Sequence, residues 1–270
     1  MTSDLQRSID KITVYAPAAS PQIDPETLLL AYRSGIFPMA DARDDPEIFW
    51  VEPRRRAILP LDGFHCSRSL VKVLRRDHFR VTCNADFAAV IRQCAGPRID
   101  AQDTWISGRI EQSYLALHDL GLAHSIECWR DQDLVGGLYG VGFDRVFCGE
   151  SMFSRVPDAS KVALAWLVAA LRRSGALLLD CQFMTDHLAS MGAVEIPQSE
   201  YLVRLRAAQR STLGAAAAGR GDGLAEGLGA GVAVGAALPD GFGALLGDAA
   251  GAGLSSSPGN FIAQSLTQTS

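Results

Sequence analysis

The chain has 270 residues, of which 48% are apolar and 20% are charged, so a wholly disordered protein is excluded. It has no run of about 18 uninterrupted apolar residues, and its polar N-terminus resembles no signal peptide, so we expect a cytoplasmic protein without membrane contact. The six cysteines include no Cys-x-x-Cys pair and no His/Cys cluster has ligand spacing. This predicts reduced thiols and no metal site.

The net charge of −5 argues at first against a nucleic-acid partner, but it hides a basic segment. Residues 54–80 hold eight basic residues against two aspartates: Arg54, Arg55, Arg56, Arg68, Lys72, Arg75, Arg76 and Arg80. A local patch of this kind can bind phosphates while the rest of the surface stays acidic. The alternative is that these basic residues form a solvated helix face that binds no nucleic acid.

Helix signals dominate the first half of the chain. Asp24 and Pro25 begin a helix that ends at Gly35, since Asp caps and Pro fits the first turn. Ser67 caps a second helix, which reaches Arg76. Its basic residues are three or four positions apart and therefore share one face. Residues 81–83 form a short strand, and residues 86–94 and 109–120 form helices.

The second half reads as strands 123–130, 134–141 and 145–148, helix 159–173 with Asp158 as its cap, strand 176–182, and a short helix after Thr185. The turn at residues 131–133 predicts a hairpin. This order fits an α+β fold with helices packed on a mixed sheet. It also fits the acyl-CoA N-acyltransferase architecture.

The last 64 residues contain 14 of the 26 glycines. Residues 231–254 are mildly apolar but are interrupted by Pro239, Asp240 and Asp248. We therefore expect a flexible, low-complexity tail from residue 207 to residue 270.

Two segments could carry chemistry. Asp180 and Gln182 end a strand and, being two positions apart, should point to one face, with Cys181 on the other. A carboxylate beside a carboxamide can hold and deprotonate an amine; a helix-capping Asp is the alternative. Glu150 and Ser151 follow another strand and could bind a polar substrate, or belong to a surface turn.

Other chemistries have weaker support. Trp50 and Trp105 lie near loops and could stack on a base, although a core position is the more common role of Trp. A Cys181–His187 nucleophilic dyad is disfavoured because Cys181 should face the core. The only match to a pyrophosphate-binding loop of an acetyl-CoA enzyme lies at residues 220–225, without a preceding strand, and we treat it as chance.

In ten short stretches the sequence resembles the bacterial leucyl/phenylalanyl-tRNA–protein transferases: residues 32–38, 49–50, 65–69, 104–106, 111–114, 124–127, 134–140, 147–155, 180–182 and 192–197. The resemblance implies transfer of Leu or Phe, sometimes Met, from an aminoacyl-tRNA to proteins that begin with Arg or Lys, which marks them for degradation. It also implies no metal and no CoA. We expect a small N-terminal domain at residues 1–62 and an acyltransferase-like catalytic domain at residues 63–206, in a monomer.

Residue roles follow from the same resemblance. Asp180 would accept a proton from, or orient, the attacking amine, Gln182 would hydrogen-bond it, and Glu150 would bind the aminoacyl group. The aminoacyl pocket would be formed by Leu138, Phe147, Leu167 and Leu179, with Ser151 nearby, and the terminal adenosine would lie near Tyr32, Met39, Trp50, Trp105 and Tyr114. The acceptor stem would contact Arg68, Lys72, Arg75 and Arg76.

The sequence departs from the family at two of these positions. Met39 stands where many members have Trp, which gives up ring stacking, and Leu167 stands where some have Phe. Two rival hypotheses remain: a CoA-dependent N-acetyltransferase and a non-catalytic RNA-binding module.

Overall fold

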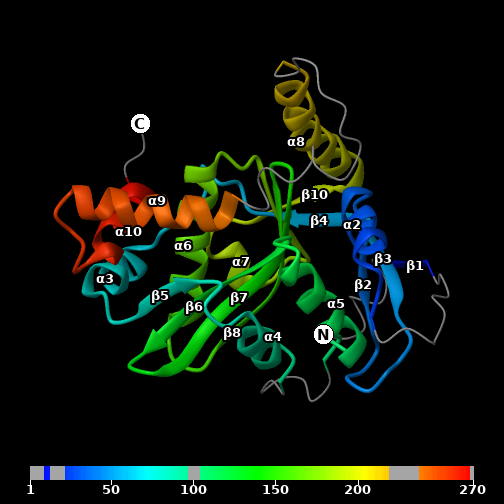
Figure 1. Cartoon of the computed structure of the whole chain (residues 1–270), viewed down its shortest axis with the longest axis horizontal. Helices are drawn as coiled ribbons and strands as arrows, with labels where there is room; N and C mark the ends of the chain where they lie inside the picture. The colour runs from blue at the N-terminus through cyan, green and yellow to red at the C-terminus, as the bar shows by residue number, and fades with distance from the viewer. Residues whose placement is uncertain (1–8, 13–21, 97–103, 219–236, 268–270) are drawn as a thin grey trace.

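The computed structural model describes residues 9–12, 22–96, 104–218 and 237–267. Within them, strands form a three-stranded sheet of order β1-β3-β2 and a seven-stranded sheet of order β10-β4-β9-β8-β7-β6-β5 (Figure 1). The small sheet comprises β1 (Ile9–Ile12), β2 (Phe37–Met39) and β3 (Phe49–Pro53). The large sheet comprises β4 (Arg55–Ile58), β5 (Arg80–Cys83), β6 (Ala123–Arg130), β7 (Asp133–Phe143), β8 (Val146–Ser154), β9 (Leu178–Gln182) and β10 (Val194–Pro197).

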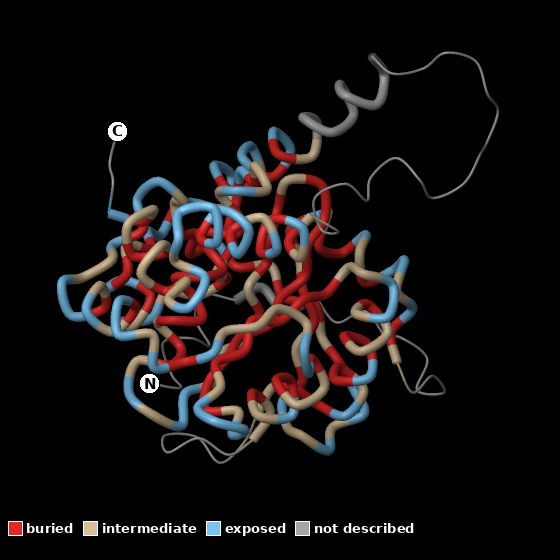
Figure 2. Tube along the Cα trace, turned by 60° about the vertical axis from the view of Figure 1, so that its left-hand side comes forward, coloured by how far each residue is buried: buried red, intermediate tan, exposed pale blue. Residues whose placement is uncertain are grey.

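Helices cover both faces of the large sheet. They are α2 (Pro25–Arg33), α3 (Arg68–Arg76), α4 (Phe87–Cys94), α5 (Gly108–Asp119), α6 (Ala159–Ser174), α7 (Asp186–Ala189), α8 (Gln198–Ala218), α9 (Ala237–Gly251) and α10 (Pro258–Thr267). One core lies between the sheet and α6, with α3, α9 and α10 outside α6; the other lies under α4 and α5 and extends to α2 and the small sheet. Figure 2 shows the buried trace running through the central strands and the exposed trace at the periphery. None of the helices described is long and apolar enough to cross a membrane.

Most elements begin where their capping residues predict. The Asp24 carboxylate accepts a hydrogen bond from the Thr27 N–H, and Ser67 Oγ accepts one from the Leu70 N–H. Asp158 differs, because its backbone is left-handed with φ of 67° and its side chain makes no cap hydrogen bond. The α+β prediction is confirmed, since a mixed sheet with helices on both faces is what the structure contains.

The N-terminal domain at residues 1–62 stays a prediction, and one of its segments joins the large sheet. Residues 55–58 form β4, which pairs with β9 and β10 in the seven-stranded sheet. The first sheet therefore ends at Pro53, and the chain passes directly into the second at Arg55.

The flexible tail is corrected for residues 237–267, which form α9 and α10; residues 219–236 lie outside the described part of the chain. Apolar residues at helical spacing make α9 pack on α6: Leu238, Phe242, Leu245 and Ala249 are all buried. Pro239 lies in the first turn, where it is tolerated, and the Asp248 carboxylate pairs with Arg173 at 2.9 Å. A side chain on Gly241 would meet the Ala170 carbonyl oxygen at 2.6 Å, so this glycine allows the close contact of α9 with α6.

The strands β8 and β9 position the site. They are parallel neighbours, and their last paired residues are Cys148 and Asp180. Beyond that pair β8 continues to Ser154 beside β7, whereas β9 ends at Gln182. The two strands therefore stop pairing at the point where the sequence places its candidate catalytic residues.

Candidate active site

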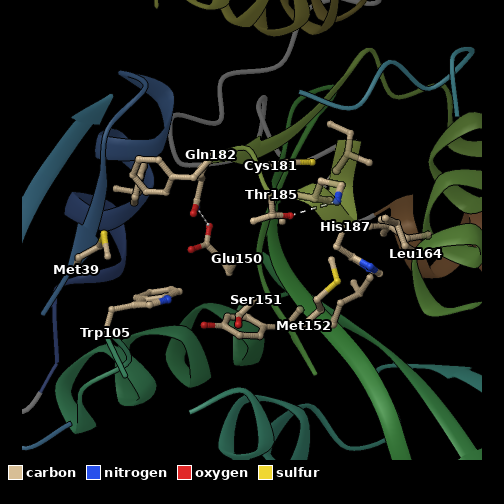
Figure 3. Close-up of a pocket in the computed structure, with 18 of the residues that line it drawn as sticks. Met39, Trp105, Glu150, Ser151, Met152, Leu164, Cys181, Gln182, Thr185 and His187 are labelled. Carbon is tan, nitrogen blue, oxygen red and sulfur yellow. Dashed lines mark hydrogen bonds between the residues drawn. The ribbon is translucent and has the colours of Figure 1, made fainter. Parts of the chain in front are cut away.

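A cavity of about 660 Å³ opens beyond the last β8–β9 pair. Its wall is mostly apolar, with a carboxylate and a carboxamide, Glu150 and Gln182, in the middle (Figure 3). Met39 and Trp105 lie on one side of this polar pair; on the other side lie Met152, Leu164, Thr185 and His187. The cavity thus has a polar centre between two less polar ends.

Glu150 enters the cavity because of a bulge in β8. Tyr139 of β7 pairs with Ser151 and Gly140 pairs with Gly149, so Glu150 is the extra residue between them. Bulges of this kind turn a side chain away from the regular alternation and are frequent beside active sites. The predicted strand end at Cys148 is therefore wrong, and the alternative of a surface turn is excluded, since β8 runs through this segment.

Side-chain donors, including the Tyr32 hydroxyl, hold the Glu150 carboxylate. Gln182 Nε2 donates to Oε1 and the Tyr114 hydroxyl donates to Oε2, each at 2.9 Å. The Tyr114 hydroxyl is in turn hydrogen-bonded to that of Tyr32. Burial raises the pKa of Glu150 to about 7, because the protein excludes the water that would stabilise the charge and the donors offset this only in part. Glu150 can therefore gain or lose a proton near neutral pH.

Gln182 reaches Glu150 through an unusual backbone conformation. Its φ is 62°, in the left-handed region that non-glycine residues seldom adopt. The strand alternation breaks there. Asp180 and Gln182 do not share a face as predicted: Gln182 lines the cavity, and so does Cys181, whereas Asp180 lies beneath it.

Asp180 is fully buried and its carboxylate is occupied. Oδ1 accepts hydrogen bonds from Arg56 Nε at 2.9 Å and from the Gln182 backbone N–H at 2.8 Å. Oδ2 accepts from Arg56 Nη2 at 2.6 Å and from the Tyr201 hydroxyl at 3.0 Å. A carboxylate offers about four lone-pair positions, and here all four are used. That Asp180 accepts a proton from the attacking amine, or orients that amine, stays a prediction; in this structure its carboxylate is held by donors of the protein itself.

Six of the ten predicted substrate-binding residues line the cavity: Met39, Trp105, Leu138, Ser151, Leu167 and Leu179. Four do not: Tyr32, Trp50, Tyr114 and Phe147, all buried in the cores. The two tyrosines lie behind Glu150 as hydrogen-bond partners, and Trp50 is held in β3 between β1 and β2. These four cannot stack on an adenine or contact an aminoacyl group, because their side chains are already surrounded by protein.

Sequence reasoning missed several residues at the site. The largest omission is Arg56, which was counted with the basic surface patch but is 1% exposed. Its position on a strand with Ala57 and Ile58, both buried, was the available signal. Further lining residues are Phe37 of β2, Leu164 of α6, Leu188 of α7, and Phe183, which follows β9.

The basic face of α3 is present. Arg68, Lys72, Arg75 and Arg76 are all exposed, while Leu70 and Leu74 on the opposite side are buried. Arg55, by contrast, is paired with Glu195. The phosphate-binding surface suggested by residues 54–80 therefore reduces to α3 and its immediate surroundings.

A cysteine nucleophile is not supported. Cys181 and His187 both line the cavity, but burial raises the pKa of the Cys181 thiol and lowers that of the His187 imidazole. The thiol therefore stays protonated. Among the described residues, no group of three or more His, Cys, Asp or Glu side chains could hold a metal ion.

Comparison with known proteins identifies the family of this chain. A family model described as leucyl/phenylalanyl-tRNA protein transferase matches residues 58–206, and one for the N-terminal domain of the same protein matches residues 22–54. The leucyl/phenylalanyl-tRNA–protein transferase of Novosphingobium aromaticivorans is 67% identical over 255 residues, covering 92% of this chain and 97% of that protein. The protein of that name from Zymomonas mobilis is 60% identical over 189 residues, covering 70% of each chain. The structure of L-PGS from Bacillus licheniformis shows a distant likeness, with a TM-score of 0.34 and 13% identity over 63% of this chain and 56% of that one. This chain belongs to the leucyl/phenylalanyl-tRNA–protein transferases, a family of aminoacyltransferases.

Proposed function

We propose that this chain transfers Leu or Phe, with Met as a third donor, from aminoacyl-tRNA to the N-terminal α-amine of proteins that begin with Arg or Lys. The new N-terminal residue would mark the acceptor for degradation. The names of the relatives support Leu, Phe and tRNA. The choice of acceptor, the donor Met and the degradation step are our extension from the sequence resemblance.

The observation that carries the proposal is the cavity. Its volume of about 660 Å³ exceeds what an apolar side chain needs and leaves room for part of a nucleoside beside it. Leu138, Leu167 and Leu179 provide an apolar wall, and Met39 and Trp105 lie on the far side of Glu150 and Gln182. We assign the leucine-lined end to the aminoacyl side chain and the end with Trp105 to the terminal adenosine. Such an apolar pocket discriminates between similar side chains by only about 1–3 kcal/mol, so more than one donor is expected.

The chemistry is attack of an amine on an ester. The acceptor nitrogen forms a bond to the aminoacyl carbonyl carbon, and the bond from that carbon to the ribose oxygen breaks. The nitrogen loses a proton and the departing ribose oxygen gains one. Because the ester is already activated, the protein has mainly to position the amine and manage its proton, so the proposal needs neither CoA nor a metal.

Glu150 is the carboxylate placed to manage that proton. It lines the cavity, and its pKa of about 7 is close to the working pH. Gln182 and Tyr114 use two of its lone-pair positions and the Tyr32 hydroxyl uses a third, which leaves about one for a substrate. Gln182 would present its amide oxygen to the incoming amine while its nitrogen holds Glu150.

The tRNA would lie against α3. The exposed Arg68, Lys72, Arg75 and Arg76 fit contacts to phosphates, which position a nucleic acid without reading its sequence. We include in the proposal a monomer, a cytoplasmic location where aminoacyl-tRNA is made, and an acyltransferase-like fold built on the separating parallel pair β8 and β9.

The test uses purified protein with radiolabelled Leu-tRNA, Phe-tRNA and Met-tRNA and with peptides that begin with Arg, Lys, Glu or Ala. We expect label on the Arg and Lys peptides without added CoA. Label on the Glu peptides instead would keep the chemistry and overturn the acceptor. Folded protein that binds tRNA but transfers nothing would favour the RNA-binding module. Stabilisation by acetyl-CoA in a melting experiment would revive the acetyltransferase.

A further inference from the structure

Arg56 is a charged residue enclosed by aromatic rings. Its guanidinium carbon lies 4.7 Å from the centroid of the Phe37 ring and 4.5 Å from that of the Tyr201 ring. Its Nη1 donates to the Gly35 carbonyl oxygen at 3.0 Å, and its other nitrogens hold Asp180. Burial by itself would lower the pKa of Arg56, but Asp180 more than offsets this, so the pKa is raised. Arg56 therefore stays charged.

The Arg56 charge lies neither at the protein surface nor in the wall of the cavity. Arg56 is 1% exposed and lies on β4, beside β9 and behind the cavity wall. Its forked geometry matches the two oxygens of a carboxylate, which a lysine cannot reproduce. A buried ion pair is weak evidence for stability, because desolvation opposes the attraction. A role in positioning accounts better for this arrangement.

The chain of contacts runs from Arg56 to the cavity in three steps. Arg56 orients the Asp180 carboxylate through both of its oxygens. Asp180 Oδ1 then accepts the hydrogen bond of the Gln182 backbone N–H at 2.8 Å, where Gln182 has its left-handed φ of 62°. The Gln182 side chain in turn holds Glu150 at 2.9 Å.

We propose that Arg56 is a positioning residue for the transfer reaction: through Asp180 it fixes the left-handed backbone of Gln182 and so aims the Gln182 amide at Glu150 and at the attacking amine. Tyr201 of α8 supports this arrangement in two ways. Its hydroxyl donates to Asp180, and its ring packs against the Arg56 guanidinium. This inference rests on the proposed function, since it takes the cavity as the place of transfer.

The main variant is Arg56→Lys, which keeps the charge and removes the fork. Its matched control is Arg55→Lys, at the next residue of the same strand, where the side chain is exposed and paired with Glu195. For Arg56→Lys we expect kcat to fall roughly 10- to 100-fold, the loss typical of a displaced reacting group, with an unchanged KM for aminoacyl-tRNA. Arg55→Lys should match the wild type in both.

A second readout needs no substrate. The pKa of Glu150 can be followed by ¹³C NMR in the free protein with labelled glutamate. The hydrogen bond from Gln182 lowers that pKa, so loosening Gln182 in Arg56→Lys should raise it, and Arg55→Lys should leave it unchanged. If the wild type transferred nothing, the proposed function would fail while this titration still tested the role of Arg56.

A folded Arg56→Lys with wild-type kcat and an unshifted Glu150 titration would overturn the inference. Should Arg56→Lys fail to fold, Tyr201→Phe decides, because it removes one hydroxyl from Asp180 and keeps the ring against Arg56. It should lower kcat and raise the Glu150 pKa in the same direction but by less; unchanged values in that variant would also reject the inference.

Discussion

Two buried carboxylates lie next to each other at this site and differ in what surrounds them. Asp180 meets an arginine fork, a tyrosine hydroxyl and a backbone N–H, all as donors. Glu150 meets only neutral donors and lies at the cavity surface. Burial raises the pKa of Glu150 to about 7. We therefore expect Glu150 to exchange the proton in the proposed reaction and Asp180 to support the residues around it.

This assignment predicts the pH dependence of transfer. With a pKa of about 7, Glu150 is mostly protonated below that pH and cannot take a proton from the amine. We expect kcat to rise with pH through about 7, and Glu150→Gln to remove this rise together with most of the activity. The measurement is the pH profile of single-turnover transfer at saturating donor and acceptor.

Unfolding experiments provide the control without substrate. Between the usual glutamate pKa of 4.5 and about 7, the folded state binds more protons at Glu150 than the unfolded state does. The contribution of this group to stability is thus present below the lower value and is lost as the pH rises, by roughly 3 kcal/mol in all. Glu150→Gln should lack this loss in urea unfolding at about pH 5 and about pH 8. Equal pH slopes for both proteins would contradict the assignment.

At the scale of elements, α6 connects two parts of the molecule. Leu164 and Leu167 on one side line the cavity, while on another side Trp166 packs against Phe242 of α9, with ring centroids 5.1 Å apart. The segment expected to be a loose tail therefore covers the helix that forms the cavity wall. The basic helix α3 also contacts this C-terminal segment. Helix α10 packs against α3, and the Gly259 N–H donates to Asp77, which follows α3, at 3.3 Å.

We predict that Phe242→Ala destabilises the protein by about 3 kcal/mol, the usual cost of emptying a buried aromatic position. The measurement is urea unfolding followed by circular dichroism. Leu246→Ala is the matched control on the same helix: with its side chain 40% exposed, the free energy of unfolding should stay within about 0.5 kcal/mol of the wild type. Equal values for both variants would mean that α9 does not pack on α6 in solution.

Local signals predicted elements well and side-chain directions poorly. Caps and turns such as Asp24, Ser67 and the 131–133 hairpin came out as expected, because each depends on a few neighbouring residues. The bulge at Glu150 and the left-handed backbone at Gln182 break the strand alternation and depend on neighbouring strands. Arg56 could not be separated from its exposed neighbour Arg55, since its partner Asp180 is 124 residues away. The apolar spacing of α9 was present in the sequence, but glycine and aspartate masked it.

The whole molecule is acidic, with a net charge of −5, yet it presents a basic helix. A basic patch on an acidic protein attracts a polyanion locally, so we expect a bound tRNA to lie against α3. The C-terminal helices α9 and α10 contain two aspartates and no basic residue, so they add no positive charge to this surface.

We predict that the double variant Arg75→Ala/Arg76→Ala weakens tRNA binding and reduces the slope of log K against log salt by about 2, or about 1 for each lost phosphate contact. Filter binding between about 50 and 200 mM salt measures this. Arg204→Ala is the control, because Arg204 is exposed on α8 and pairs with Glu200. Unchanged affinity in the double variant would show that the tRNA lies elsewhere.

The cluster of Arg56, Asp180 and Tyr201 behind the cavity also affects when the fold can be completed during translation. Arg56 leaves the ribosome 145 residues before Tyr201, one of the residues that enclose it. At about 5–20 residues per second, the interval is roughly 7–30 s. Asp180 follows Arg56 by 124 residues, so the guanidinium lacks both partners for most of that time and lacks Tyr201 until the end of it. Until these partners arrive it stays in water and β4 cannot take its buried place. The cavity is therefore a late product of translation, completed only after the chain has been extended into α8.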